Sequence, residues 1–238
     1  MADTSHQVAH TIKAYDEELQ QLVNIIAWMG GQAEAQLSSA IVALVKRDSD
    51  LAGRVIHGDA KVDEMEHETH KLVLRLLALR QPMGIDLRHI FAALKISSDI
   101  ERIADYAANV AKRSIVLNQL PPVPPVSAVP RMGQLAQELI RNVLDAYVEL
   151  DKQKAMDVWN HDEDLDNAYN SLIRELLTYM LEDPRNITAC THLMFIAKNI
   201  ERIGDHATNI AENIFFLVEG ASPAGQRPKG DIGHTVSG

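Results

Sequence analysis

The chain has 238 residues, a formal net charge of −10 and only 5% aromatic residues. That length suits one large domain or two small ones, and the low aromatic content, with sparse Gly and Pro before residue 118, is typical of an all-helical protein. The acidic balance favours a cation or a basic protein surface over nucleic acid as the main partner, because phosphate binding needs clustered Lys and Arg.

Apolar residues at helical spacing predict three long helices in the first half of the chain. They are expected over about residues 5–46, 49–80 and 85–118. Asp48 should cap the second helix, and Gln81-Pro82 should end it, because proline lacks an amide hydrogen and cannot continue a helix. Gly30-Gly31 predicts a weak point within the first helix.

A proline-rich segment over residues 119–130 separates the two halves. Its prolines remove hydrogen-bond donors and fix φ, so we expect a linker that breaks any helix. Beyond it the same order returns, with helices ending near residues 150, 181 and 218. The prediction is therefore an all-α fold of two tandem three-helix bundles, each with its own core. The bundles should cover residues 1–118 and 131–219, followed by a disordered tail over 220–238.

Targeting and redox signals are lacking in the sequence. Cys190 is the only cysteine, so the chain can form no internal disulfide and no thiolate metal cage. Residues 1–6 have no charged-then-apolar signal pattern, and no apolar run approaches the roughly 20 residues needed to cross a bilayer. We therefore expect a cytoplasmic protein.

The chain contains an internal duplication. The pattern Glu-Arg-Ile-x-Asp-x-Ala-x-Asn-x-Ala occurs at residues 101–111 and again at 201–211. Between residues 94 and 117, ten of 24 residues are identical to those 100 positions later. Further upstream, a shift of 103 matches Asp59 with Asp162 and Asp63 with Asp166. The change of offset falls in the turn before the third helix, where a difference in loop length costs little.

The duplicated polar residues are spaced four apart, which places them on one face of each helix. We call them the first acidic set (Asp59, Asp63, Glu101, Asp105 and Asn109) and the second acidic set (Asp162, Asp166, Glu201, Asp205 and Asn209). Their angular position relative to the apolar stripes predicts a solvent-accessible rim.

A bound cation would explain why like charges recur one turn apart, since such pairs repel by a few tenths of a kcal/mol. Ligation by oxygen alone suits Mg²⁺, Mn²⁺ or Fe. The alternative is a solvated acidic face, in which the acids pair with nearby bases. The available bases are Arg102, Lys112, Lys198 and Arg202.

A carboxylate-bridged multinuclear metal enzyme, an oxidase or hydrolase, is a second alternative. Glu64-x-x-His67 resembles half of a ferritin-type iron motif, but its counterparts are Asn167 and Asn170. The sequence has no glycine-rich phosphate loop, Ser/His/Asp set or Cys/His pair. We therefore expect a protein without enzymatic activity.

The two Glu-Arg-Ile motifs, the two Asp-x-x-x-Asp pairs, and Arg80-Gln81-Pro82 leading to Asp86-Leu87-Arg88 together resemble the PhoU family. The resemblance covers about residues 8–218. PhoU proteins are accessory proteins of the bacterial phosphate-specific transport system. The resemblance implies two three-helix bundles, each holding a metal cluster on its four acids, with Asn109 and Asn209 as additional ligands.

The resemblance further implies a negative regulator, which represses phosphate uptake and the phosphate-starvation response when phosphate is plentiful. Its partners would be the transporter's ATPase and the membrane sensor kinase. It would form a homodimer and reach the inner membrane only through these partners. The segment Asp86-Leu87-Arg88 corresponds to Asn186-Ile187-Thr188 in the second half, so the halves are expected to bind different partners.

Overall fold

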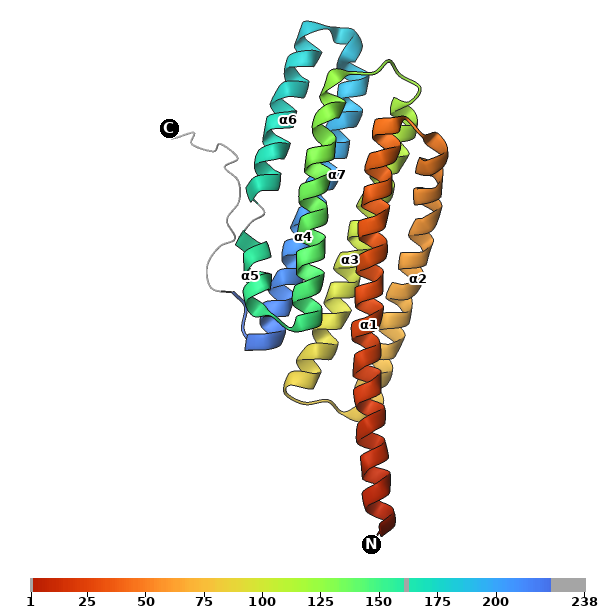
Figure 1. The fold of residues 1–238 in the computed structure, drawn as a ribbon, viewed down its shortest axis with the longest axis vertical. Helices are drawn as coiled ribbons and strands as arrows, with labels where there is room; N and C mark the ends of the chain where they lie inside the picture. The colour runs from red at the N-terminus through yellow and green to blue at the C-terminus, as the bar shows by residue number, and fades with distance from the viewer. Residues whose placement is uncertain (1, 161–162, 224–238) are drawn as a thin grey trace.

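The computed structural model describes residues 2–160 and 163–223, with side chains from residue 15 onward. Within these residues the chain forms seven α-helices and two short 3₁₀-helices, and no strand (Figure 1). In chain order they are α1 (Ala2–Lys46), α2 (Ser49–Arg80), α3 (Ile85–Leu117), η1 (Pro124–Ala128), α4 (Val129–Glu149), α5 (Lys152–Asn160), α6 (Glu163–Glu182), η2 (Pro184–Asn186) and α7 (Ile187–Glu219).

The helix ends follow local signals in the sequence. Asp48 caps α2 by accepting a hydrogen bond from the Leu51 amide at 2.8 Å. Asp151 accepts from the amides of Gln153 and Lys154 at 2.8 and 3.1 Å at the matching position of the second half. Gln81 ends α2 in the left-handed conformation, with φ of 50°. The predicted Asp48 cap and the predicted stop at residue 81 are confirmed.

Two details of the structure refine the prediction. The proline-rich segment does not exclude helix, since residues 124–128 form η1 and α4 begins at Val129. Proline is tolerated in the first turn of a helix, where its missing amide hydrogen has no intrahelical partner. The glycine pair at residues 30–31 does not interrupt α1, which is continuous to Lys46.

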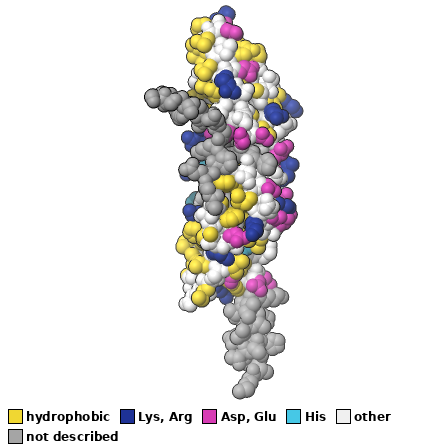
Figure 2. All heavy atoms as spheres, turned by 90° about the vertical axis from the view of Figure 1, so that its left-hand side faces the viewer, with side chains coloured by type: hydrophobic (Ala, Val, Ile, Leu, Met, Phe, Trp, Pro, Cys, Tyr) yellow, Lys and Arg dark blue, Asp and Glu magenta, His cyan; other side chains and the backbone are white. Residues whose placement is uncertain are grey.

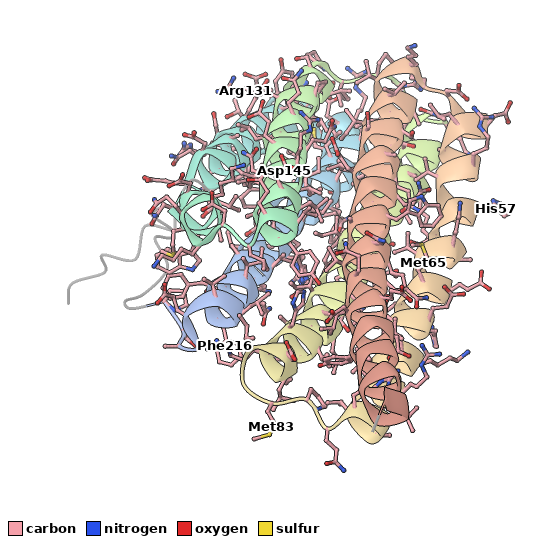
Figure 3. The ribbon with its side chains drawn as sticks, turned by 60° about the horizontal axis from the view of Figure 1, so that its bottom comes forward. His57, Met65, Met83, Arg131, Asp145 and Phe216 are labelled. Carbon is pink, nitrogen blue, oxygen red and sulfur yellow. The ribbon has the colours of Figure 1, made fainter. Side chains whose placement is uncertain are left out.

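Helices α3 and α7 run antiparallel through the middle of the molecule (Figure 1). Arg113, near the end of α3, stacks 4.0 Å from the Phe195 ring centroid, near the start of α7. At the opposite end, the rings of Phe91 and Phe216 lie 6.2 Å apart, and Figure 3 shows Phe216 beside the first turns of α3. The two Glu-Arg-Ile motifs therefore lie at the same level, near the middle of these paired helices.

Helices α1 and α4 cover one side of the α3–α7 pair, and they also run antiparallel. Arg141 of α4 donates to Glu34 of α1 at 2.6 Å. Helix α2 flanks the first half and α5–α6 flank the second (Figure 1). Buried residues of both halves, including Ile103 and Ile203, form one continuous hydrophobic cluster. The structure thus replaces the two separate cores expected from the sequence with a single core shared through α3 and α7.

Apolar side chains are exposed at the turn that connects the second and third helices of each half. Met83 is 82% exposed in the turn between α2 and α3, and Leu181 is 86% exposed near the end of α6. These two turns lie at opposite ends of the molecule (Figure 1). Figure 2 shows the α5–α6 side, with apolar side chains at its upper end and acidic side chains along one edge.

Two further predictions concern the membrane and the C-terminal tail. Among residues 2–160 and 163–223, no helix is both long and apolar enough to cross a bilayer. Helix α7 ends at Glu219 and is followed by its C-cap Gly220, which has φ of +78°. The rest of the predicted tail lies outside the described residues from 224 onward.

The adjacent glycines of α1 should respond oppositely to alanine. A Cβ at Gly30 would lie 2.3 Å from Cδ2 of Leu144, a largely buried residue of α4, whereas a Cβ at Gly31 would have no neighbour within 4 Å. We expect Gly30→Ala to cost about 1–3 kcal/mol through overpacking. Gly31→Ala should gain about 0.5–1 kcal/mol, because alanine is the better helix former. Urea unfolding measures both; equal effects would contradict the close α1–α4 approach.

Candidate functional site

The first acidic set lies where α2 and α3 face each other. Asp59 and Asp63 come from α2, and Glu101 and Asp105 from α3. Figure 3 shows His57 of α2 pointing away from the bundle, whereas Met65 is buried. The Glu101 and Asp105 side chains are 18% and 35% exposed. Glu101 is therefore more buried than the rim expected from the sequence, while Asp105 lies at the border with solvent.

Electrostatic coupling shows that these four acids lie within range of one another. Burial raises the pKa of Asp59 to about 6, with further increases from Asp105 and Asp63, and Lys112 opposes them. Burial likewise raises the pKa of Glu101 to about 7, and Asp105 adds to this increase while Arg102 opposes it. The charges of Asp63 and Asp105 thus make ionisation of Asp59 and Glu101 less favourable, as expected for like charges at one site.

Glu66 is a fifth acid of this site that the sequence analysis missed. Its charge contributes to the raised pKa of Glu101. It accepts a hydrogen bond at 2.7 Å from the Ser98 hydroxyl, which ties α2 to α3. The duplication could not reveal Glu66, because the residue 103 positions later is Tyr169. Its spacing three residues after Asp63, on the same helix face, was the available signal.

Two oxygens of this site lack partners among the described residues. Oδ1 of Asp59 and Oδ1 of Asp63 are buried and accept no hydrogen bond there. Arg102 contacts the other two acids, at 3.4 Å from Glu101 and 3.2 Å from Asp105. A buried carboxylate oxygen without a partner is costly and is normally satisfied by water or a cation. The donor atoms are therefore of the chemical kind that hard metal ions prefer.

The side chains do not, however, converge on one point. Within residues 2–160 and 163–223, no group of three or more His, Cys, Asp or Glu side chains is arranged to hold a metal ion. Asn109 lies one turn after Asp105, and its Oδ1 is 3.4 Å from Lys112 Nζ.

The second acidic set is only partly within the described structure, because Asp162 lies outside it. Glu201 and Asp205 come from α7 and Asp166 from α6. Burial raises the pKa of the Glu201 carboxyl, opposed by its hydrogen bond with Lys198 and reinforced by Asp205. The Lys198 ammonium lies 2.7 and 2.6 Å from the two oxygens of Glu201. The pairing with Lys198 anticipated by the solvated-face alternative is thus present.

Asn209 contacts the other half of the molecule. Its amide nitrogen lies 3.5 Å from Oδ1 of Asp99 on α3, and His206 Nδ1 lies 2.8 Å from the same oxygen. In the reverse direction, Arg202 of α7 donates to the Tyr106 hydroxyl of α3 at 3.2 Å. These polar contacts join α3 to α7 between the two acidic sets.

The histidine of the ferritin-like pattern makes a contact within its own helix. His67 Nδ1 is hydrogen-bonded to the backbone carbonyl of Asp63 at 2.8 Å. The matching positions of the second half, Asn167 and Asn170, do not supply the second Glu-x-x-His pair that a ferritin-type site needs.

The fold and the site define a class: an all-helical protein built from a duplicated three-helix unit, with acidic side chains between the second and third helices of each unit. Comparison with protein families agrees, since the PhoU domain model matches twice, over residues 26–114 and 129–214. The chain belongs to the PhoU family.

Curated relatives are similar along nearly their whole length. A protein of Caulobacter vibrioides is 50% identical over 224 residues, covering 94% of this chain and 97% of its own. A protein of Xylella fastidiosa is 51% identical over 222 residues, covering 93% and 92%. Both are described as a phosphate-specific transport system accessory protein PhoU homolog.

Two solved structures share the fold. The crystal structure of PhoU from Pseudomonas aeruginosa has a TM-score of 0.83 and 37% identity, covering 87% of this chain and all of that one. The phosphate transport system regulatory protein PhoU from Streptococcus pneumoniae has a TM-score of 0.80 and 27% identity, covering 88% and 99%. The predicted all-α fold of duplicated three-helix bundles is confirmed.

Proposed function

We propose that this protein is a non-enzymatic negative regulator of phosphate uptake and of phosphate-starvation signalling. The observation that carries this proposal is the similarity to phosphate-specific transport accessory proteins over more than nine-tenths of the chain, at about 50% identity. In this role the protein acts in the cytoplasm as an adaptor between the ATPase of the phosphate transporter and the phosphate sensor kinase. It works as a homodimer and reaches the inner membrane through these partners.

The distribution of surface features supports an adaptor with two different contact regions. Exposed apolar residues lie at the turn between α2 and α3 and again near the end of α6, at opposite ends of the molecule (Figure 1). The sequences next to the two turns differ. The first half has Asp86-Leu87-Arg88, and the matching segment of the second half is Asn186-Ile187-Thr188. Each turn can therefore recognise a different partner.

The acidic sets supply the regulatory element of this proposal. In the first set, Asp59, Asp63, Glu101 and Asp105 would hold a divalent or trivalent ion such as Fe, Mn or Mg, with Asn109 as an additional oxygen ligand. When bound, the ion supplies positive charge that removes the repulsion between the carboxylates. The side chains themselves tie α2 to α3, so that the helices present a defined surface to the ATPase and the kinase.

Neutralising the first acidic set should impair repression in cells. The variant carries Asp59→Asn, Asp63→Asn, Glu101→Gln and Asp105→Asn, and is expressed in a strain that lacks its own copy of the protein. We expect a phosphate-starvation reporter to be strongly expressed in phosphate-rich medium, as in the strain without the protein, because the metal-held α2–α3 surface is lost. Reporter activity and phosphate uptake measure the effect.

A matched variant controls for the change in net charge. It replaces four exposed acids outside the acidic sets and should repress normally: Asp50→Asn, Glu68→Gln, Glu138→Gln and Glu175→Gln. Normal repression by the first variant, at equal protein level, would show that these acids have no regulatory role.

A further inference from the structure

Helix α1 extends beyond the helices that pack against it. Arg80, the last residue of α2, donates to Glu18 of α1 at 3.0 Å, so α2 ends level with Glu18. Figure 1 shows the N-terminal end of α1 projecting past the turn between α2 and α3. We call residues 2–14 the N-terminal arm. At 1.5 Å per residue, this helical segment is about 20 Å long.

The apolar spacing of the packed part of α1 continues into the arm. Within the bundle, Leu22 and Ile26 are fully buried, and Leu19 packs against the core. The same heptad spacing, which alternates three and four residues, runs through Val8, Ile12, Tyr15, Leu19, Leu22 and Ile26. A short helix is marginal in water unless its apolar residues pack against a partner. The arm thus has the sequence of a packed helix beyond the end of its own bundle.

An open groove of about 680 Å³ lies between α3 and α7 at the same end of the molecule. We call it the α3–α7 groove; its lining includes Phe91, Leu94 and Lys95 of α3, and Asn209, Glu212 and Phe216 of α7. Figure 3 shows Phe216 at the end of the molecule where Met83 lies. The lining comes from α3, from α7 and from Ser222 just after α7, so the groove lies on the side opposite to α1 and α4.

The acids of the groove are bonded within the protein, whereas its aromatic residues are partly exposed. Asp99 is bonded to His206 of α7, as described above, and Glu212 accepts a hydrogen bond from the Trp159 indole at 2.9 Å. Phe91 is 44% exposed and packs edge-on against Phe216. Such a groove suits the apolar residues of a helix better than a small charged ligand.

We propose that the α3–α7 groove binds the N-terminal arm of a second copy of this chain, so that two copies exchange arms. The inference rests on the homodimer of the proposed function and names its interface. Because α1 and the groove lie on opposite sides of one end, a two-fold axis perpendicular to the long axis brings each arm to the groove of the other copy. The lengths are compatible, since the groove follows α3 from Phe91 to Asp99, about 12 Å.

Sedimentation velocity over a series of protein concentrations tests this interface. Ile12→Asp changes the arm and Phe91→Asp changes the groove. We expect each to raise the dissociation constant of the dimer at least about tenfold, as for a residue at the centre of an interface. Phe195→Asp is the control, because Phe195 is 50% exposed near the start of α7, at the other end of the molecule. It should dimerise as the wild type does.

Mixing the two variants separates a lost contact from a misfolded protein. A mixed dimer of Ile12→Asp and Phe91→Asp keeps one intact arm opposite one intact groove. The equimolar mixture should therefore dimerise more tightly than either variant alone. Misfolding of either variant would give no such recovery.

The outcomes distinguish this inference from the homodimer on which it rests. A wild type that is monomeric at every concentration would remove both the homodimer and the arm–groove contact. If the wild type dimerises and both variants dimerise as tightly, the homodimer stands, but another surface forms it and the inference is wrong. Weakened dimers in both variants without recovery in the mixture would also overturn the contact.

Discussion

Addition of Mn²⁺ to the metal-free protein should raise its unfolding temperature by about 5–10 °C. A ligand that binds only the folded form stabilises it by about 2.7 kcal/mol at 100 times its dissociation constant. For a chain of this size, each kcal/mol shifts the unfolding temperature by roughly 2–4 °C. The first acidic set carries this expected effect, because its acids repel one another and two of its buried oxygens have no partner among the described residues.

The variant with Asp59→Asn, Asp63→Asn, Glu101→Gln and Asp105→Asn should show no such shift. Without metal it should unfold at or above the temperature of the wild type, since neutralisation removes the repulsion between the carboxylates. The exposed-acid control, with the same change in charge, should respond to Mn²⁺ as the wild type does. A full shift in the four-residue variant would assign the metal effect to another place on the protein, and the absence of any shift in the wild type would favour a solvated acidic face.

Helix positions were predictable because their signals are local. The capping side chain of Asp48 and the left-handed Gln81 act within a few residues of the helix ends that they define. Apolar periodicity likewise shows which face of a helix is buried. It does not show which helix covers that face, so the antiparallel pairing of α3 with α7 and the shared core were not predictable from it.

The acidic sites were predictable only where the duplication preserved them. Comparison of the halves found Glu101 and Glu201, but it missed Glu66, because the matching residue of the second half is Tyr169. The burial of Glu101 was also underestimated. Its angular position on its own helix does not show that α2 packs over it. The contact of Lys198 with Glu201 required the side-chain geometry, since the sequence offered four bases as partners.

The pH dependence of stability should show that ionisation of Glu101 destabilises the folded, metal-free protein. In the folded, metal-free protein its pKa is raised from 4.5 to about 7. Between these values the folded state binds more protons than the unfolded state, so this carboxyl makes stability fall as the pH rises. The cost is absent below about pH 4.5, where the group is protonated in both states, and complete above about pH 7.

Glu101→Gln should therefore stabilise the metal-free protein at pH 8 by about 1 kcal/mol, less than the full shift in pKa implies because solvent screens the site. The difference from the wild type should shrink toward zero as the pH falls to about 5. Urea unfolding of both proteins across this range measures it. Glu201→Gln is the comparison in the second half and should bring a smaller gain, because the hydrogen bond from Lys198 opposes the effect of burial on the pKa of Glu201. If the wild type is more stable than Glu101→Gln at pH 8 without metal, the ionised Glu101 side chain does not destabilise the folded protein.

Saturating Mn²⁺ should reverse this order at pH 8. The wild type then gains the binding free energy of the ion, while Glu101→Gln loses a charged ligand and with it part of that gain. A carboxylate that lowers stability in the empty protein and raises it in the loaded protein links the α2–α3 contact to metal occupancy.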